Sequence, residues 1–132
     1  MSNINERKTS TDGLRVLSLC GGVETGLYAL QKLGIPVKEY HTYEILPEAI
    51  AVSQYHFPFV VHHGDLYKAD FDQFKGFDLL LCGSCCQSLS KCRIESKEVN
   101  TGLDGKSKIF FRAVEALRVI QPKYFMLSLI HI

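Results

Sequence analysis

A pair of adjacent cysteines after an apolar run is the feature of this sequence most suited to covalent chemistry. Residues 77–82 (FDLLLC) read as a buried strand, and residues 83–87 (GSCCQ) follow it as a loop. In an open α/β sheet, ligands and reacting groups are held in the loops after the strands. A partly exposed loop also favours ionisation of a thiol, and the thiolate is the reactive form. Cys86 is therefore the candidate nucleophile.

A second set of candidate residues lies at three successive strand ends. Gly21, Gly22 and Gly26 follow the first predicted strand, Glu44 closes the second and Asp65 closes the third. Glycines let the backbone come close to a ligand, and a helix start offers unpaired N–H groups. A carboxylate after the second strand can accept hydrogen bonds from two ribose hydroxyls. The pattern predicts an adenosyl site, with a purely structural role of the turn and the acids as the alternative.

The charge of the glycine turn favours one class of adenosyl ligand. Glu24 lies inside the turn, where it would repel a pyrophosphate, and the glycine spacing is not the G-x-G-x-x-G of dinucleotide sites. We therefore expect S-adenosylmethionine, which carries no phosphate.

Alternating strands and helices must position these residues. The alternation predicts an α/β fold with a parallel sheet of about five strands and helices on both faces. Strands are expected at residues 14–20, 37–43, 59–63, 77–82 and 124–130. Helices are expected at residues 24–33, 48–55 (after Pro47), around 70–74 and 107–119, with a long loop at 84–106.

Composition and charge narrow the classes of protein. Of the 132 residues, 46% are apolar, which is enough for one packed domain, and the net charge of +1 gives no overall sign of polyanion binding. No run approaches the roughly 20 apolar residues that span a bilayer, and the N-terminus does not resemble a signal peptide. The five cysteines are an odd number, which fits a reducing compartment. We expect a chain that is not secreted and has no membrane partner.

The cysteines leave other roles open. Cys82 and Cys85 have the spacing of zinc ligands, and further ligands could come from Cys86, Cys92, His62 or His63. A redox switch formed by Cys82 and Cys85, or by Cys85 and Cys86, is a second alternative. The simplest interpretation of Cys20 and Cys82 is that both are small core residues.

Taken together, the motifs resemble the DNA (cytosine-5) methyltransferases. Residues 18–26 (SLCGGVETG) look like the family's first cofactor motif. Residues 83–90 (GSCCQSLS) look like its nucleophile motif, Gly-Ser-Pro-Cys-Gln-x-x-Ser, and residues 122–127 match the approach to its Glu-Asn-Val motif. The similarity runs from about Leu14 to Met126, which is most of the chain.

This resemblance implies a Rossmann-like, S-adenosylmethionine-dependent methyltransferase fold. Residues 13–132 would form part of the catalytic domain, after a disordered tail at residues 1–12. The substrate would be double-stranded DNA, as in the enzymes of restriction-modification systems, and the location would be the cytoplasm or the nucleoid.

The resemblance also assigns roles to individual residues. Cys86 would add to C6 of a cytosine that has left the duplex stack, so that C5 can take the methyl group. The residues implied in binding S-adenosylmethionine are Leu19, Cys20, Gly22, Val23, Glu24, Thr25, Glu44, Ile45, Asp65, Leu66, Cys85 and Ile109.

Four residues depart from the family pattern. Cys20 stands in place of an aromatic wall of the cofactor pocket, Cys82 in place of a glycine, and Cys85 in place of the proline before the nucleophile. Ser128 stands where the family has the glutamate that engages cytosine N3. General acid-base assistance is typically worth about a hundred- to ten-thousandfold in rate. We therefore expect weak or absent methyl transfer by this chain alone.

The end of the chain suggests an alternative of another class. The chain stops at Ile132, before the family's target-recognition region, which would leave residues 124–132 as an open apolar strand. Such a strand could pair with a second polypeptide or with a second copy. The alternative function is a non-catalytic module that binds the cofactor or pairs with a partner.

Overall fold

The computed structural model describes residues 13–83 and 108–128. Several predictions concern other residues and lie outside this described part. They are the disordered tail at residues 1–12, the loop with Cys85 and Cys86, and the last residues of the fifth strand.

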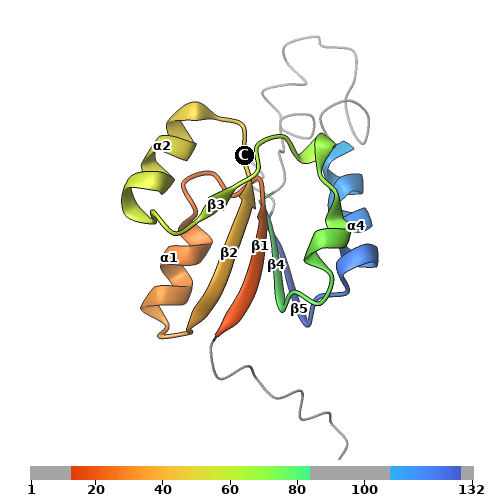
Figure 1. Cartoon of the computed structure of the whole chain (residues 1–132), viewed down its shortest axis with the longest axis horizontal. Coiled ribbons are helices and arrows are strands. Elements are labelled where there is room, and N and C mark those ends of the chain that lie inside the picture. Colours follow the sequence, from red (N-terminus) through yellow and green to blue (C-terminus); the bar gives the residue numbers. More distant parts are fainter. Residues whose placement is uncertain (1–12, 84–107, 129–132) are drawn as a thin grey trace, which may run out of the picture.

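Five parallel strands form one sheet in the order β3-β2-β1-β4-β5 (Figure 1). The strands are β1 (Leu14–Leu19), β2 (Val37–Tyr43), β3 (Val61–His62), β4 (Leu79–Gly83) and β5 (Tyr124–Ser128). The helices are α1 (Thr25–Lys32), α2 (Pro47–His56) and α4 (Lys108–Ile120), with two short 3₁₀ helices, η1 (Leu66–Lys68) and η2 (Phe71–Phe74). The predicted α/β fold is confirmed.

Helices cover both faces of the sheet. Figure 1 shows α1 and α2 on one side, and α4 with the 3₁₀ helices on the other. Alternation along β1 divides its side chains between the two layers. Val16 packs on the α1 side, together with Leu27 and Leu30, whereas Leu17 and Leu19 pack on the α4 side. Among the described helices, none is long and apolar enough to cross a membrane.

The direction of chain travel reverses between β1 and β4. From β1 the chain moves outward through β2 and β3, and it then returns to add β4 and β5 on the other side of β1. In open parallel sheets, the crevice at such a reversal, outside the carboxyl ends of the strands, is where ligands bind. The ends of β1 and β4 therefore mark the place to look for a site.

The third strand is shorter than predicted. Strand β3 contains two residues, whereas the apolar run predicts a strand over residues 59–63. The difference arises because a turn follows α2: Val60 N–H donates to the carbonyl of Phe57 (3.1 Å), and the exposed Phe59 lies in this turn. The residues after β3 also form the unpredicted helix η1, for which Asp65 is the N-cap.

Strand β5 is only partly covered. It pairs with β4 in register from Leu79↔Tyr124 to Gly83↔Ser128. The side chains of Tyr124, Phe125 and Met126 are 51%, 44% and 61% exposed. Within the described residues, β5 is thus an apolar strand at the edge of the sheet.

Candidate functional site

Two cavities meet at the carboxyl ends of β1 and β4. One has a volume of about 430 Å³ and lies by the start of α1, and the other, of about 480 Å³, lies between the ends of β2, η1 and α4. Both are lined by Cys20 and Gly83, so these two residues form a shared wall. The second cavity is also lined by six predicted or neighbouring residues: Glu44, Ile45, Leu46, Asp65, Leu66 and Ile109.

The shared wall depends on a glycine at the end of β4. A Cβ atom at Gly83 would come within 2.8 Å of the Cys20 carbonyl oxygen, so only glycine allows this approach. The carbonyl of Tyr43 accepts a hydrogen bond from Cys20 N–H (2.8 Å), which fixes the end of β1 against β2. The turn from β1 to α1 is therefore held from both neighbouring strands.

The turn itself leaves room for a ligand. Gly22 has a φ of 62°, and a Cβ built there would meet nothing within 4 Å. The start of α1 lies directly behind it, at Thr25, which lines the first cavity. A ligand can therefore approach the main chain of the turn closely, as the glycine pattern predicts.

The two predicted acids lie on the second cavity, and main-chain N–H groups hold both of them. Glu44 Oε2 accepts from Ile45 N–H (3.0 Å), and Asp65 Oδ1 accepts from Tyr67 N–H (2.9 Å). Asp65 thus caps η1, as the structural alternative proposes, and also lines the cavity. Ile45 is 66% exposed beside them. This combination of fixed acids with apolar walls suits an aromatic heterocycle that carries hydroxyl groups.

An aromatic stack fixes the segment that leads to Asp65. The ring of His63 stacks on those of Tyr43 and His41, with both centroid distances at 5.1 Å. Nδ1 of His41 lies 2.8 Å from Nε2 of His63. The carbonyl of Thr42 accepts a hydrogen bond from the main-chain N–H of His63 (2.9 Å). Burial lowers the pKa of His63, with smaller contributions from neighbouring histidines, and so favours the neutral form of the ring.

Helix α4 holds the other wall of the second cavity. The guanidinium of Arg112 donates to the carbonyls of Leu66 and Ala69, at 3.2 and 2.7 Å. It also lies over the ring of Phe71, 4.7 Å from the centroid. Arg112 therefore ties η1 to α4 and sets the position of Leu66 opposite Ile109. Sequence reasoning missed this role because Arg112 looks like a surface residue of an amphipathic helix.

The carboxylate of Glu24 points into the protein. Its side chain is 1% exposed and accepts hydrogen bonds from the hydroxyls of Tyr40 (2.6 Å) and Thr42. Glu24 lies on the first cavity, as do its partner Tyr40 and Ser18. The expectation that Glu24 faces a ligand directly in the turn therefore needs revision, because the charge lies beneath the turn.

Cys82 is a core residue. Its side chain is 2% exposed, and burial raises the pKa of its thiol to about 11. The thiol is therefore protonated at neutral pH, which disfavours a role as metal ligand or redox partner. Among the described residues, no three His, Cys, Asp or Glu side chains are grouped so that they could hold a metal ion. The remaining cysteines of the zinc and redox alternatives lie outside the described part.

The ends of β4 and β5 meet at the same edge. Ser128 is the register partner of Gly83, and both line the first cavity together with Met126. Met126 was missed as a cavity residue because the apolar pattern of β5 gives no sign of which neighbours its side chains meet.

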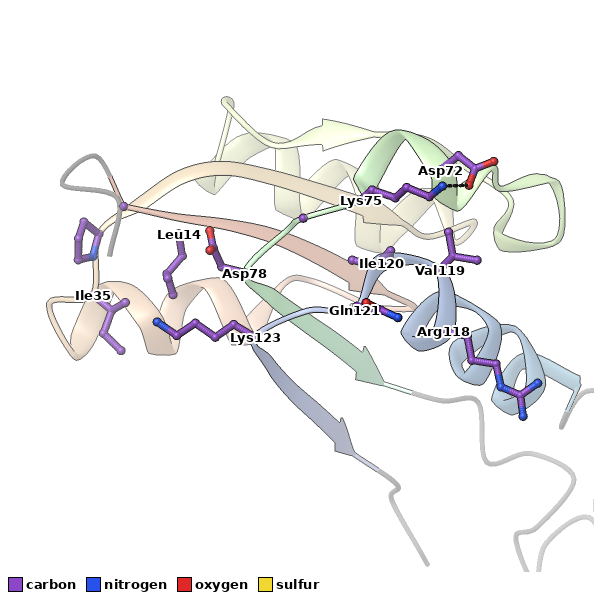
Figure 2. Close-up of a pocket in the computed structure, with 13 residues that line it drawn as sticks. Leu14, Ile35, Asp72, Lys75, Asp78, Arg118, Val119, Ile120, Gln121 and Lys123 are labelled. Atoms are coloured by element: carbon purple, nitrogen blue, oxygen red, sulfur yellow. Dashed lines mark ion pairs between the residues drawn. The ribbon is translucent and has the colours of Figure 1, made fainter. Parts of the chain in front are cut away.

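A cavity larger than these two lies at the opposite edge of the sheet. It has a volume of about 1050 Å³ and is lined by residues near the amino ends of the strands (Figure 2). Its two acids are engaged in the fold: Asp72 pairs with Lys75 (3.2 Å), and Asp78 accepts from Arg15 N–H (2.9 Å). The lining of this cavity includes none of the predicted strand-end residues, so this cavity is not the candidate site.

Comparison with known proteins identifies the family. The model of the C-5 cytosine-specific DNA methylases matches residues 14–128. The chain belongs to this family. The Type II methyltransferase M.NlaIV of Neisseria lactamica is 31% identical over 108 residues, which are 81% of the chain and 25% of that protein. The Orphan methyltransferase M.SPRI of Bacillus phage SPR is 31% identical over 115 residues, which are 86% of the chain and 25% of that protein.

A solved structure supports the fold. The crystal structure of the S. pombe Dnmt2 methyltransferase superposes with a TM-score of 0.65 and 21% identity, over 89% of the chain and 34% of that protein. The chain thus spans about a quarter of the length of the curated methylase relatives given above.

The methylase motif residues are not all gathered at the cavities. Cys20, Gly22, Glu24 and Thr25 line the first cavity, but Leu19 is fully buried in the α4-side core. Because its side chain is buried, Leu19 could contact a ligand through its main chain only. Val23 is exposed but is not among the residues that line either cavity. Cys85 and Cys86 lie outside the described residues.

Proposed function

We propose that this chain is the cofactor-binding part of a DNA (cytosine-5) methyltransferase, which transfers a methyl group from S-adenosylmethionine to cytosine C5 in double-stranded DNA. One observation carries the proposal. Three successive strand ends bring the glycine turn, Glu44 and Asp65 to two cavities that share the wall of Cys20 and Gly83. Family membership supplies the reaction class.

The residues of the second cavity fit the adenosine half of this cofactor. The Glu44 carboxylate would accept hydrogen bonds from the ribose hydroxyls, and Asp65 would accept one from the adenine amino group. Ile45, Leu66 and Ile109 offer apolar surface for the purine ring. The space above Gly22 allows the rest of the ligand to lie against the main chain of the turn. When bound, the cofactor supplies a methyl group on a positively charged sulfur.

Cys86 would supply the nucleophile. Its thiolate would form a bond to cytosine C6, and the electron pair displaced to C5 would accept the methyl group that the cofactor supplies. Transfer of the C5 proton to water and release of the Cys86 thiolate would then restore the aromatic ring. The main chain that leads to this loop begins at Gly83, on the wall shared by the two cavities.

The support for that chemistry is incomplete in this chain. Ser128 lies opposite Gly83, where the family pattern places a carboxylic acid. A hydroxyl can donate a hydrogen bond to the cytosine edge but is far too weak an acid to replace that group, which costs about a hundred- to ten-thousandfold in rate. We therefore infer weak or absent methyl transfer by this chain alone.

An assay of methyl incorporation tests the catalytic part of the proposal. Mixed double-stranded DNA and methyl-labelled S-adenosylmethionine are incubated with the chain and with the Cys86→Ala variant. We expect incorporation by the two proteins to be indistinguishable from background. Clear incorporation that depends on Cys86 would overturn the inference of weak activity.

The exposed edge strand supports a second candidate function. Three consecutive residues of β5, Tyr124, Phe125 and Met126, are half-exposed on an edge strand. Edge strands with apolar side chains are sites of pairing with another chain. A module that pairs through β5 with a second polypeptide or a second copy is therefore the alternative, and the size of the chain in solution tests self-pairing.

A further inference from the structure

Glu24 is a buried carboxylate without a cationic partner in the described structure. Its side chain is 1% exposed, and the ion pairs among residues 13–83 and 108–128 involve other carboxylates. Burying a carboxylate is costly unless hydrogen bonds or an opposite charge compensate for it. Here the compensation within the described part of the protein comes from neutral hydroxyl groups.

Hydroxyl groups contact both oxygens of the Glu24 carboxylate. Tyr40 donates to one carboxylate oxygen (2.6 Å), and Thr42 donates to the other. These two hydrogen bonds replace part of the hydration that a carboxylate loses on burial. Burial, and secondly the charge of Glu24, raise the pKa of Tyr40, so the phenol keeps its proton and remains a donor.

The carboxylate lies directly against the glycine turn. A Cβ atom placed on Gly21 would come within 2.3 Å of Glu24 Oε2 and 2.5 Å of Oε1. Of the described residues that line the first cavity, Glu24 is the one with a charged side chain. The carboxylate of Glu24 therefore lies in the lining of this cavity, against the main chain of Gly21.

We propose that the Glu24 carboxylate makes this cavity selective for a ligand with a positively charged sulfonium over the neutral thioether that remains after methyl transfer. The inference rests on the proposed function and deepens it. S-adenosylmethionine loses a positive charge at sulfur when its methyl group leaves, whereas the α-amino group is the same in cofactor and product. A nearby buried carboxylate therefore stabilises the cofactor more than the product, and it favours exchange of product for fresh cofactor.

The same placement explains why the charge is buried and not displayed in the turn. A solvent-exposed carboxylate is screened by water and salt, whereas a buried one interacts more strongly with a ligand charge nearby. Glu24 is the N-cap of α1, and Tyr40 and Thr42 belong to β2, which Figure 1 shows beside α1. The hydrogen bonds from their hydroxyls hold the carboxylate in place. Glu24 thus determines specificity through the electrostatic attraction between its carboxylate and the charge of the ligand.

Isothermal titration with three ligands tests the proposal. The ligands are S-adenosylmethionine, the thioether product S-adenosylhomocysteine, and an analogue in which a protonated amine replaces the sulfonium. They are titrated into the wild type and into Glu24→Gln, which keeps the shape but removes the charge. Glu48→Gln, which removes an exposed carboxylate from α2, is the matched control.

The expected result is a change in the ratio of affinities. Glu24→Gln should weaken binding of the two cationic ligands about tenfold and leave the affinity for the thioether within about twofold, while Glu48→Gln keeps the wild-type ratio. An equal loss for all three ligands in Glu24→Gln would show that the carboxylate only holds the turn, and would overturn the proposal.

The wild type alone provides a test that needs no folded variant. The protonated amine analogue should bind more tightly than the thioether, and equal affinities would contradict the proposal. If the wild type binds none of the three ligands, the proposed function fails and the selectivity fails with it. Binding of all three ligands without charge preference would leave the proposed function standing and reject the role of Glu24.

Discussion

The β1–β2–β3 side and the β4–β5 side of the carboxyl edge differ in how firmly their ends are held. On the first side, main-chain hydrogen bonds connect Cys20 to Tyr43 and His63 to Thr42, and the acids Glu44 and Asp65 are each fixed by an N–H group. On the second side, β5 is an edge strand with half-exposed apolar side chains.

The two sides also differ in their candidate functional residues. The β1–β2–β3 side has the glycine turn and the two acids that an adenosyl ligand needs. The β4–β5 side presents Ser128 where the resemblance implies an acid. The two sides meet at the wall of Cys20 and Gly83, which lines both cavities.

The largest effect should come from comparing two leucines of the same core. Leu19 of β1 is fully buried, and Leu127 of β5 is only partly buried against the same core cluster. Leu19→Ala should lower the free energy of unfolding by about 2–5 kcal/mol, and Leu127→Ala by about 1 kcal/mol, because a less buried side chain leaves a smaller cavity. Urea unfolding measures both values, and equal losses would contradict the difference between the two sides.

A charge on the edge strand should change association. Phe125 lies on β5 and is 44% exposed. If β5 pairs with another copy, the wild type should associate with rising concentration, and Phe125→Lys should weaken that association about tenfold or more, since a charged edge side chain opposes strand pairing. Sedimentation of both proteins measures this. A wild type that remains monomeric at all concentrations would remove self-pairing from the account.

A smaller effect is expected at the histidine stack. His63→Ala should lower the free energy of unfolding by about 0.5–1.5 kcal/mol, through loss of its ring contacts with Tyr43 and His41. Because the folded-state pKa of His63 is lowered, its neutral ring stabilises the fold above the ordinary histidine pKa of 6.5. This contribution is lost as the pH falls below 6.5 through the lowered value.

The pH dependence provides the check for His63. In urea unfolding between pH 7.5 and 5, the wild type should lose stability on acidification, and the neighbours His41, His62 and Glu39 are present in both proteins. A slope in His63→Ala as steep as in the wild type would show that His63 is not the group responsible.

Much of the β1–β2–β3 side could be predicted from the sequence. The apolar runs locate β1, β2 and β4, and Pro47 marks the start of α2, because these signals are local. The acids Glu44 and Asp65 could be placed because parallel strands present their carboxyl ends on one edge.

Other features depend on contacts between distant segments. The inward direction of Glu24 needs the hydroxyls of Tyr40 and Thr42, sixteen and eighteen residues away. The shortness of β3 reflects the turn after α2, and helix η1 needs the Asp65 cap and the Arg112 anchor. No single stretch of sequence shows these pairings. The assignment of Cys86 and Cys85 concerns residues outside the described part and stays a prediction.

The most direct test of the central claim is a calorimetric titration of S-adenosylmethionine into the wild type, Glu44→Ala and the exposed control Glu48→Ala. Glu44 would accept two hydrogen bonds from the ribose, and bonds to a charged group are worth about 1.5–3 kcal/mol each. The account predicts saturable binding by the wild type and by Glu48→Ala, and a loss of at least about tenfold in Glu44→Ala. No detectable heat from the wild type at millimolar cofactor, or equal binding by all three proteins, would contradict it.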